Sequence, residues 1–190
     1  MLFTIVNWLL IFITCGVLGL TIIRLTYRDF LESDSGLILM LSQVIGLLSL
    51  ALFLLFLSIF IPVGIECFLF ALLVSCFIYY FSKEIKLKFI KIIFDFLKIG
   101  IFRSFALLAL VAIYSSQIIF WGDSANYHIN AIRWIHEIGI VYGIANLIGQ
   151  LGFVSSWFAL NSSLQLDNFL VGRSYAILGG YVLFLSLIHI

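Results

Sequence analysis

The residues best able to do chemistry gather in one short stretch, Trp121 to Trp134, which reads W-G-D-S-A-N-Y-H-I-N-A-I-R-W. It contains an acid, Asp123, followed by Tyr127 and His128 and then by Arg133. A carboxylate or an imidazole can move a proton, and a guanidinium can hold a phosphate. The stretch follows an apolar run long enough to cross a bilayer. We therefore expect this chemistry at the boundary between membrane and water.

The composition identifies the class of protein that must position these residues. Apolar residues make up 64% of the chain and charged residues 10%, against about 45–50% and about 25% in soluble domains. The apolar runs are continuous, which excludes the alternating pattern of a membrane β-barrel. No basic block of the kind that binds nucleic acid is present. We predict an all-α polytopic membrane protein with the lipid bilayer, and no nucleic acid, as its partner.

Apolar runs of about 20 residues predict about five spans. They cover residues 1–23, 36–61, 65–82, 99–120 and 169–190, with Pro62 and Gly64 separating the second from the third. We divide the chain into residues 1–98, with three spans and a basic helix, and residues 99–190. The second part contains a span, an external loop over 121–168 and a final span. Cys15, Cys67 and Cys76 lie in or beside these runs without metal-ligand spacing, so we interpret them as helix-packing residues.

Basic residues predict the orientation. Arg24 and Arg28 occupy the first loop, and five lysines lie between Lys83 and Lys98. These two loops should therefore be cytoplasmic, with the N-terminus, the Pro62 turn and the 121–168 loop outside a bacterial inner membrane. The segment from Lys83 to Lys98 also places basic and apolar residues on opposite faces, which predicts an interfacial helix against anionic lipid. The alternative is a regulatory or partner-binding helix.

Two parts of the external loop allow alternative interpretations. Residues 138–166 are uncharged and long enough to span, but their density of glycine and polar residues favours an interfacial or re-entrant segment. Residues 124–138 predict an amphipathic helix with Asn130 and Arg133 on its polar face. Asp123 before it is either the cap of this helix or a general base or metal ligand. Tyr127 and His128 are either anchors at the interface or parts of a site.

The first motif, D-S-A-N-Y-H-I-N-A-I-R-W, is followed at residues 146–158 by N-L-I-G-Q-L-G-F-V-S-S-W-F. Together they resemble bacterial GT-C-like membrane proteins, similar to glycosyltransferases that use polyprenyl-phosphate-linked sugars. The resemblance covers residues 121–180. The chain departs from the family pattern at Ile148, Gln150 and Val154, where the family has histidine, arginine and asparagine. The chain therefore lacks an imidazole and a cation that the family has at these positions.

The resemblance implies an external loop with two amphipathic helices, over 124–138 and 153–166, and Asp123 as the catalytic residue. The implied reaction is inverting sugar transfer from a lipid-linked donor, in which Asp123 takes a proton from the acceptor hydroxyl. An unshifted aspartate, with a pKa near ~3.9, is a weak base, so partial desolvation or a divalent cation would have to assist. The substrate-binding residues implied are Tyr127, His128, Arg133, Asn146 and Gln150.

The end of the chain, L-S-L-I-H-I at residues 185–190, resembles the translation of a sequencing adapter. We therefore expect an N-terminal fragment of a longer glycosyltransferase-like protein, inactive by itself. A natively short membrane protein is the alternative. Two other functions stay open, namely a non-catalytic transporter or assembly component for lipid-linked glycan, and a structural membrane subunit.

Overall fold

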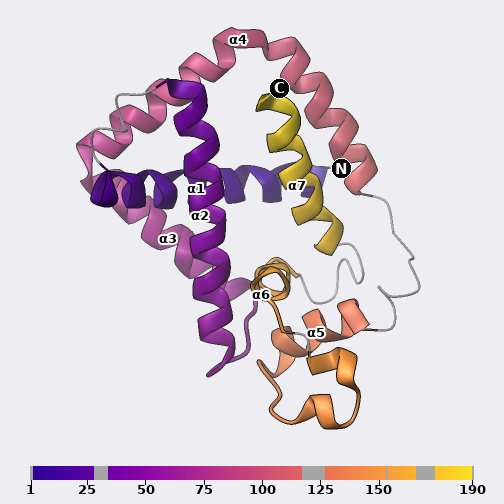
Figure 1. Ribbon diagram of the computed structural model, residues 1–190. Coiled ribbons are helices and arrows are strands. Elements are labelled where there is room, and N and C mark those ends of the chain that lie inside the picture. The colour runs from indigo at the N-terminus through magenta and orange to yellow at the C-terminus, as the bar shows by residue number, and fades with distance from the viewer. Residues whose placement is uncertain (1, 28–33, 117–126, 153, 166–173, 190) are drawn as a thin grey trace.

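The computed structural model describes residues 2–27, 34–116, 127–152, 154–165 and 174–189, and Figure 1 shows their arrangement. Its elements are α1 (Leu2–Thr26), α2 (Ser35–Ser58), α3 (Ile65–Phe81), α4 (Lys83–Ser115), α5 (Ile129–Glu137), η3 (Ile144–Asn146), η4 (Gly149–Gly152), α6 (Ser156–Ser163) and α7 (Ser174–His189). Within these ranges every element is a helix and none is a strand. The predicted all-α fold is therefore confirmed for this part of the chain.

Two helices of the described ranges are long and apolar enough to cross a membrane, α1 with 25 residues and α2 with 24. A third candidate joins α3 to the start of α4, but the chain bends there by 102°. Ser104–Ser115 within α4 and Ala176–Leu187 within α7 are apolar but shorter than a bilayer requires. Apolar helices thus occupy all five predicted places, and two or three of them qualify as spans. The complete five-span topology stays a prediction.

Helix α4 runs without interruption from the predicted basic helix into the predicted fourth span, and Figure 1 shows it arching over the molecule. Its sequence contains no proline and a single glycine, Gly100, so no residue stops the helix at the expected boundary between residues 98 and 99. The apolar face of its first part, formed by Ile85, Phe89 and Ile92, is buried against α1 and α2. This face therefore contacts protein. That the lysines on the same helix contact anionic lipid stays a prediction.

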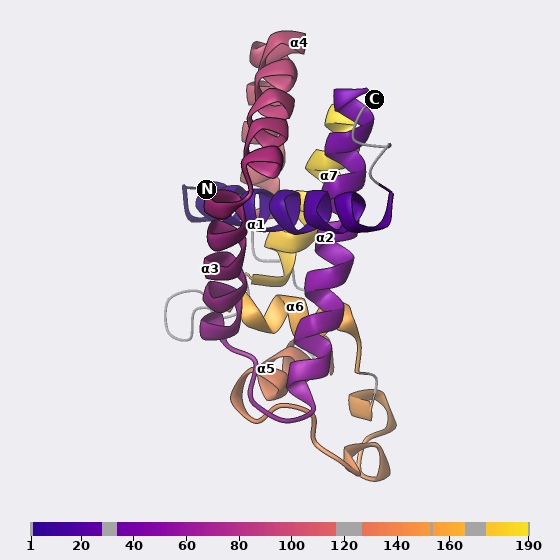
Figure 2. The same cartoon turned by 90° about the vertical axis from the view of Figure 1, so that its left-hand side faces the viewer.

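Helix α1 crosses α2 at a contact between small residues, and Figures 1 and 2 show the two helices lying crosswise. A Cβ added at Gly19 would overlap the backbone carbonyl of Ser42, and one at Gly46 would overlap the backbone carbonyl of Cys15. Only glycine lets two helix backbones approach so closely. The glycines therefore determine the point at which each helix meets the other.

Buried hydrogen bonds attach α7 to the first two helices. Trp8 Nε1 donates to the carbonyl oxygen of Ile177 at 2.7 Å. Tyr181 Oη donates to Gln43 Oε1 at 2.7 Å, and Gln43 Nε2 donates to the carbonyl oxygen of Phe12 at 3.2 Å. Gln43 is fully buried, so leaving it without partners would cost free energy. These bonds hold the last described helix in one position against α1 and α2.

The turn between α2 and α3, residues 59–64, packs against the end of α5. The amide of Val63 donates to the carbonyl oxygen of Ile135 at 2.9 Å, and the amide of Ile140 donates to that of Ser58 at 2.7 Å. Both segments therefore lie at the same end of the molecule, at the bottom of Figure 1. The predicted topology requires this grouping. The side of a membrane on which this end lies stays a prediction.

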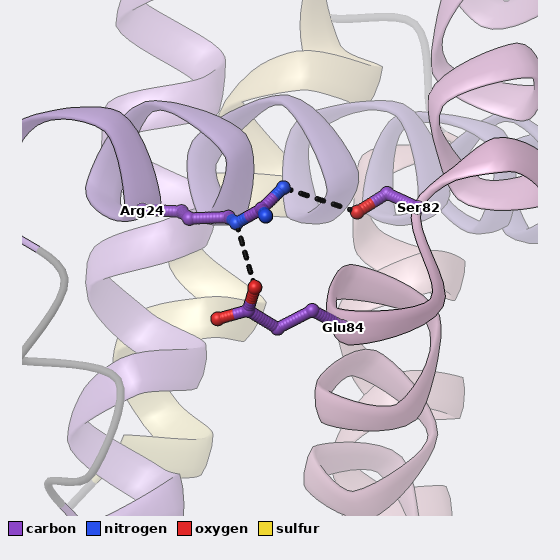
Figure 3. Close-up of polar contacts among 3 residues, drawn as sticks. All are labelled: Arg24, Ser82 and Glu84. Atoms are coloured by element: carbon purple, nitrogen blue, oxygen red, sulfur yellow. Dashed lines mark hydrogen bonds and ion pairs between the residues drawn. The ribbon is translucent and has the colours of Figure 1, made fainter.

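The basic end of α1 meets the junction of α3 and α4, as Figure 3 shows. Arg24 Nε lies 2.9 Å from Glu84 Oε2, and Arg24 Nη1 donates to Ser82 Oγ at 3.3 Å. The two loops predicted to share the cytoplasmic side are thus neighbours in the fold. The ion pair is partly exposed, so it contributes little to the free energy of folding.

Candidate functional site

The first motif enters the described structure at Tyr127 and continues into α5. Ala131, Ile132 and Ile135 form the buried side of this helix, and Arg133 is exposed on the other. The predicted amphipathic helix is confirmed for these residues. The helix therefore presents the polar half of the motif away from the core.

Asp123 and Trp121 lie outside the described residues. The two roles considered for Asp123, catalytic acid or base and helix cap, both stay predictions. The described structure begins four residues later, with the Tyr127–His128 pair. Tyr127 and His128 are therefore the first residues of the candidate site that the structure describes.

His128 links the first motif to the second. Its ring centroid lies 4.2 Å from that of Tyr127 and 5.6 Å from that of Phe158, a residue of α6. All three side chains are half-buried. Tilted aromatic contacts of this kind position the rings relative to one another. The structure thus brings two predicted binding residues together with the second motif.

His136 makes a second link between α5 and α6. Its Nδ1 lies 3.1 Å from the carbonyl oxygen of Ser162, the distance of a hydrogen bond in which the ring donates. A Cβ added at Gly64 would lie 3.5 Å from His136 Cε1 and would overlap Glu66 Oε2. The imidazole of His136 and the carboxylate of Glu66 therefore border the same small space. Neither residue was predicted for the site.

The sequence contained a signal for His136. It follows Ile132 by four residues, and this spacing places it on the same side of the helix as that buried residue. Glu66 was visible only as the acid that interrupts a long apolar run. Its proximity to His136 depends on the turn at residues 59–64, which the sequence marks as a break without giving its direction.

The second motif ends in the first residues of α6, which is shorter than the predicted helix over 153–166. Ser155 caps it, because its Oγ accepts from the amide of Phe158 at 3.2 Å. Asn161, Ser162 and Ser163 are fully buried within α6. The predicted amphipathic pattern is therefore wrong for α6, which packs against α2 and α5 with its polar residues buried. Its position at a membrane interface stays a prediction.

The buried polar residues of α6 are only partly satisfied. Ser162 Oγ and Ser163 Oγ donate to carbonyl oxygens three residues earlier, and Asn161 Nδ2 donates to that of Trp157 at 2.7 Å. Within the described part of the chain, Asn161 Oδ1 and Gln165 Oε1 are buried and accept no hydrogen bond. Buried acceptors usually have a partner. The C-terminal end of α6 therefore offers two acceptors to a donor.

Asn146 and Gln150 lie on η3 and η4, in a segment that Figure 1 shows as a hook beyond α5. Both side chains are exposed. No hydrogen bond joins either side chain to His128 in the described part of the chain, and their role in binding stays a prediction. Over the described part of residues 138–165 the longest helix has 8 residues, too few to cross a bilayer. The spanning alternative for this segment finds no support.

Arg133 is exposed and paired. Its Nε donates to Glu137 Oε1 at 2.7 Å, one helical turn away. This hydrogen bond raises the pKa of the Arg133 guanidinium above its usual range. The guanidinium is thus cationic, and a phosphate would compete with Glu137 for it.

Among the described residues, no three His, Cys, Asp or Glu side chains gather as they would around a metal ion. The divalent cation considered beside Asp123 stays a prediction, because Asp123 is outside these ranges.

Comparison with curated proteins gives no match, and comparison with solved structures gives none either. One protein family matches over residues 1–190. The chain therefore belongs to the family described as a domain of unknown function, DUF8201.

Proposed function

We propose that the chain is the N-terminal part of a glycosyltransferase-like protein of the bacterial inner membrane, which transfers sugar from a polyprenyl-phosphate donor to a cell-envelope acceptor. The observation that carries the proposal is the contact between the two motifs. The ring of His128 in the first motif packs on Phe158 in the second, 5.6 Å between centroids. The two motifs of the resemblance are thus in contact at this point, although 30 positions separate His128 from Phe158.

The chemistry proposed for this site uses one carboxylate. Asp123 would take the proton of an acceptor hydroxyl as that oxygen bonds to the anomeric carbon of the donor sugar. The bond from this carbon to the lipid phosphate breaks, and the phosphate leaves with the electron pair. Tyr127 and His128, next in the motif, would hold the substrates beside Asp123. The apolar helices would anchor the protein in the membrane, where a lipid-linked donor resides.

The test is Asp123→Asn in the protein expressed from its native gene. Membranes containing this variant should transfer labelled sugar from the polyprenyl-phosphate donor about 100-fold or more slowly, the contribution of a general base. Asp34→Asn is a matched control, because Asp34 caps α2 and asparagine caps equally well. Equal rates for the wild type and the Asp123 variant would contradict the proposal.

A second candidate is a non-catalytic component of glycan export. The exposed positions of Asn146 and Gln150 favour it, together with the departures from the family pattern at Ile148 and Val154. In that case the wild type would show no sugar transfer, and binding or transport of the lipid-linked glycan would survive Asp123→Asn. The two measurements together separate the candidates.

A further inference from the structure

A cavity of about 700 Å³ lies under the arch of α4 and is bordered by α1, α3, α4 and α7. Figure 1 shows α4 above this region and α1 running crosswise below it. The volume falls within the range of about 300–1,000 Å³ that is usual for ligand sites. The cavity lies away from the α5–α6 contact, and no residue of either motif lines it.

The walls of the cavity are hydrocarbon and aromatic surface. Along α1, Ile5, Trp8 and Phe12 line it at helical spacing, and Tyr181 lines it from α7. The polar groups of Trp8 and Tyr181 already have hydrogen-bond partners. Trp8 Nε1 donates to the carbonyl of Ile177, and Tyr181 Oη donates to Gln43. The rings therefore present apolar faces to the cavity, which suits an alkyl chain.

A cation lies at one border of the cavity. Lys86 Nζ lies 5.9 Å from the centroid of the Tyr79 ring, and Tyr79 in turn contacts Phe89 edge to face at 6.1 Å. Tyr79 and Phe89 both line the cavity. Lys86 is exposed, as are Lys83 and Lys91 on the same helix. Hydrocarbon walls with a cation at the rim complement a molecule that has an apolar chain and an anionic head.

We propose that this cavity binds one anionic glycerophospholipid, with an acyl chain under α4 and the phosphate beside Lys86. A zwitterionic lipid offers the same chain without net charge, so it gains less from the lysines. The site is independent of sugar transfer, because it shares no residue with the α5–α6 contact. Its occupant would hold α1, α3, α4 and α7 together by filling the space between them.

The test measures quenching of Trp8 in detergent micelles. In the 190-residue chain, Trp121, Trp134 and Trp157 are replaced by phenylalanine, which leaves Trp8 as the single reporter. Phosphatidylglycerol with brominated acyl chains should quench it saturably, at about fivefold lower concentration than brominated phosphatidylcholine, as expected for one lysine. Lys86→Gln should remove this preference. Equal quenching by the two lipids before and after this substitution would overturn the proposal.

A second pair of variants tests the cavity itself. Cys76 lines it and is exposed, so Cys76→Phe should fill part of the space and weaken quenching by both lipids at least fivefold. Leu73→Phe is the matched control on α3, because Leu73 is exposed and outside the cavity. If both variants behave alike, the quenching comes from the micelle and the proposal fails.

Mass spectrometry of the purified wild-type chain under native conditions requires no substitution. A bound mass equal to one phosphatidylglycerol, lost in Lys86→Gln, supports the site. Displacement of the brominated lipid by polyprenyl phosphate at lower concentration would identify a different occupant. A dimer mass without lipid would mean that a second copy covers the cavity. Either of these last two results overturns the proposal.

Discussion

The α1–α2 crossing and the α5–α6 contact are held together in opposite ways. At the crossing, backbone meets backbone, because Gly19 and Gly46 have no side chain to separate the helices. Between α5 and α6 the links come from the side chains of two histidines. The crossing thus depends on the missing side chains of two glycines, whereas the α5–α6 contact depends on particular polar and aromatic side chains.

This difference suggests different purposes. A glycine contact tolerates no substitution but offers no chemical group, which is the property of a scaffold. The α5–α6 region keeps two buried acceptors, on Asn161 and Gln165, that accept no hydrogen bond within the described residues. Groups left unsatisfied cost free energy unless something uses them. The α5–α6 region is therefore the part of the molecule in which we propose a site.

The largest effect should come from enlarging a residue at the crossing. Gly46→Ala introduces a Cβ that overlaps the Cys15 carbonyl, a backbone atom that cannot move aside. We expect the free energy of unfolding in detergent to fall by about 3 kcal/mol. Gly179→Ala is the matched control, since no atom lies within 4 Å of a Cβ there. Equal denaturation midpoints for the two variants would show that the crossing is not the scaffold described.

Two glycines near the first motif allow the effect of backbone strain to be distinguished from the effect of a steric clash. Gly139 and Gly143 have φ of +88° and +82°, so alanine is strained at both. At Gly139 the added Cβ would also lie 2.8 Å from the carbonyl oxygen of Ser58. Gly139→Ala should therefore cost about 1–2 kcal/mol more than Gly143→Ala. Hydrogen exchange of the Val63 and Ile140 amides would measure it, and identical protection would contradict the packing of this turn.

Replacing a histidine between α5 and α6 should lower the free energy of unfolding less than the glycine substitutions do. His136→Phe loses the hydrogen bond to the Ser162 carbonyl, at a cost of about 1 kcal/mol. His128→Phe keeps an aromatic ring against Phe158 and should leave the stability nearly unchanged. Chemical denaturation of the two variants gives the comparison. Equal destabilisation by His128→Phe and His136→Phe would contradict the prediction that His128 acts through ring packing and His136 through a hydrogen bond.

The smallest effect should come from the ion pair in Figure 3. Arg24→Gln removes the ion pair with Glu84. Both side chains are 37% exposed, so we expect the free energy of unfolding to fall by about 0.5 kcal/mol or less. The loss should shrink in high salt, because salt screens exposed charges. Thermal unfolding at two salt concentrations would check it. A loss as large as that of Gly46→Ala would mean that charge, and not close backbone contact, holds the scaffold.

Sequence patterns predicted those features that depend on local composition. The apolar runs, the break at Pro62 and the buried face of α5 each follow from residues close together in the chain. The continuity of α4 could have been predicted as well, because its sequence contains no proline. Its mixed composition, basic and then apolar, suggested two elements where the backbone forms one.

Features that depend on the direction of a turn were not predictable. The neighbourhood of Glu66 and His136 requires the chain at residues 59–64 to fold onto α5, a contact between distant segments. The burial of Asn161, Ser162 and Ser163 contradicts their polarity. It becomes possible because most of their hydrogen bonds are made within the helix. Composition alone assigns such residues to a surface.

The attachment of α7 has a consequence for the timing of biogenesis. Gln43 receives its hydrogen bond from Tyr181, 138 residues later in the chain. At a synthesis rate of about 5–20 residues per second, that interval lasts on the order of ten seconds. During this interval, Gln43 Oε1 lacks the hydrogen bond from Tyr181. A membrane insertase or chaperone that shelters this face during translation would therefore act on α1 and α2 until α7 emerges.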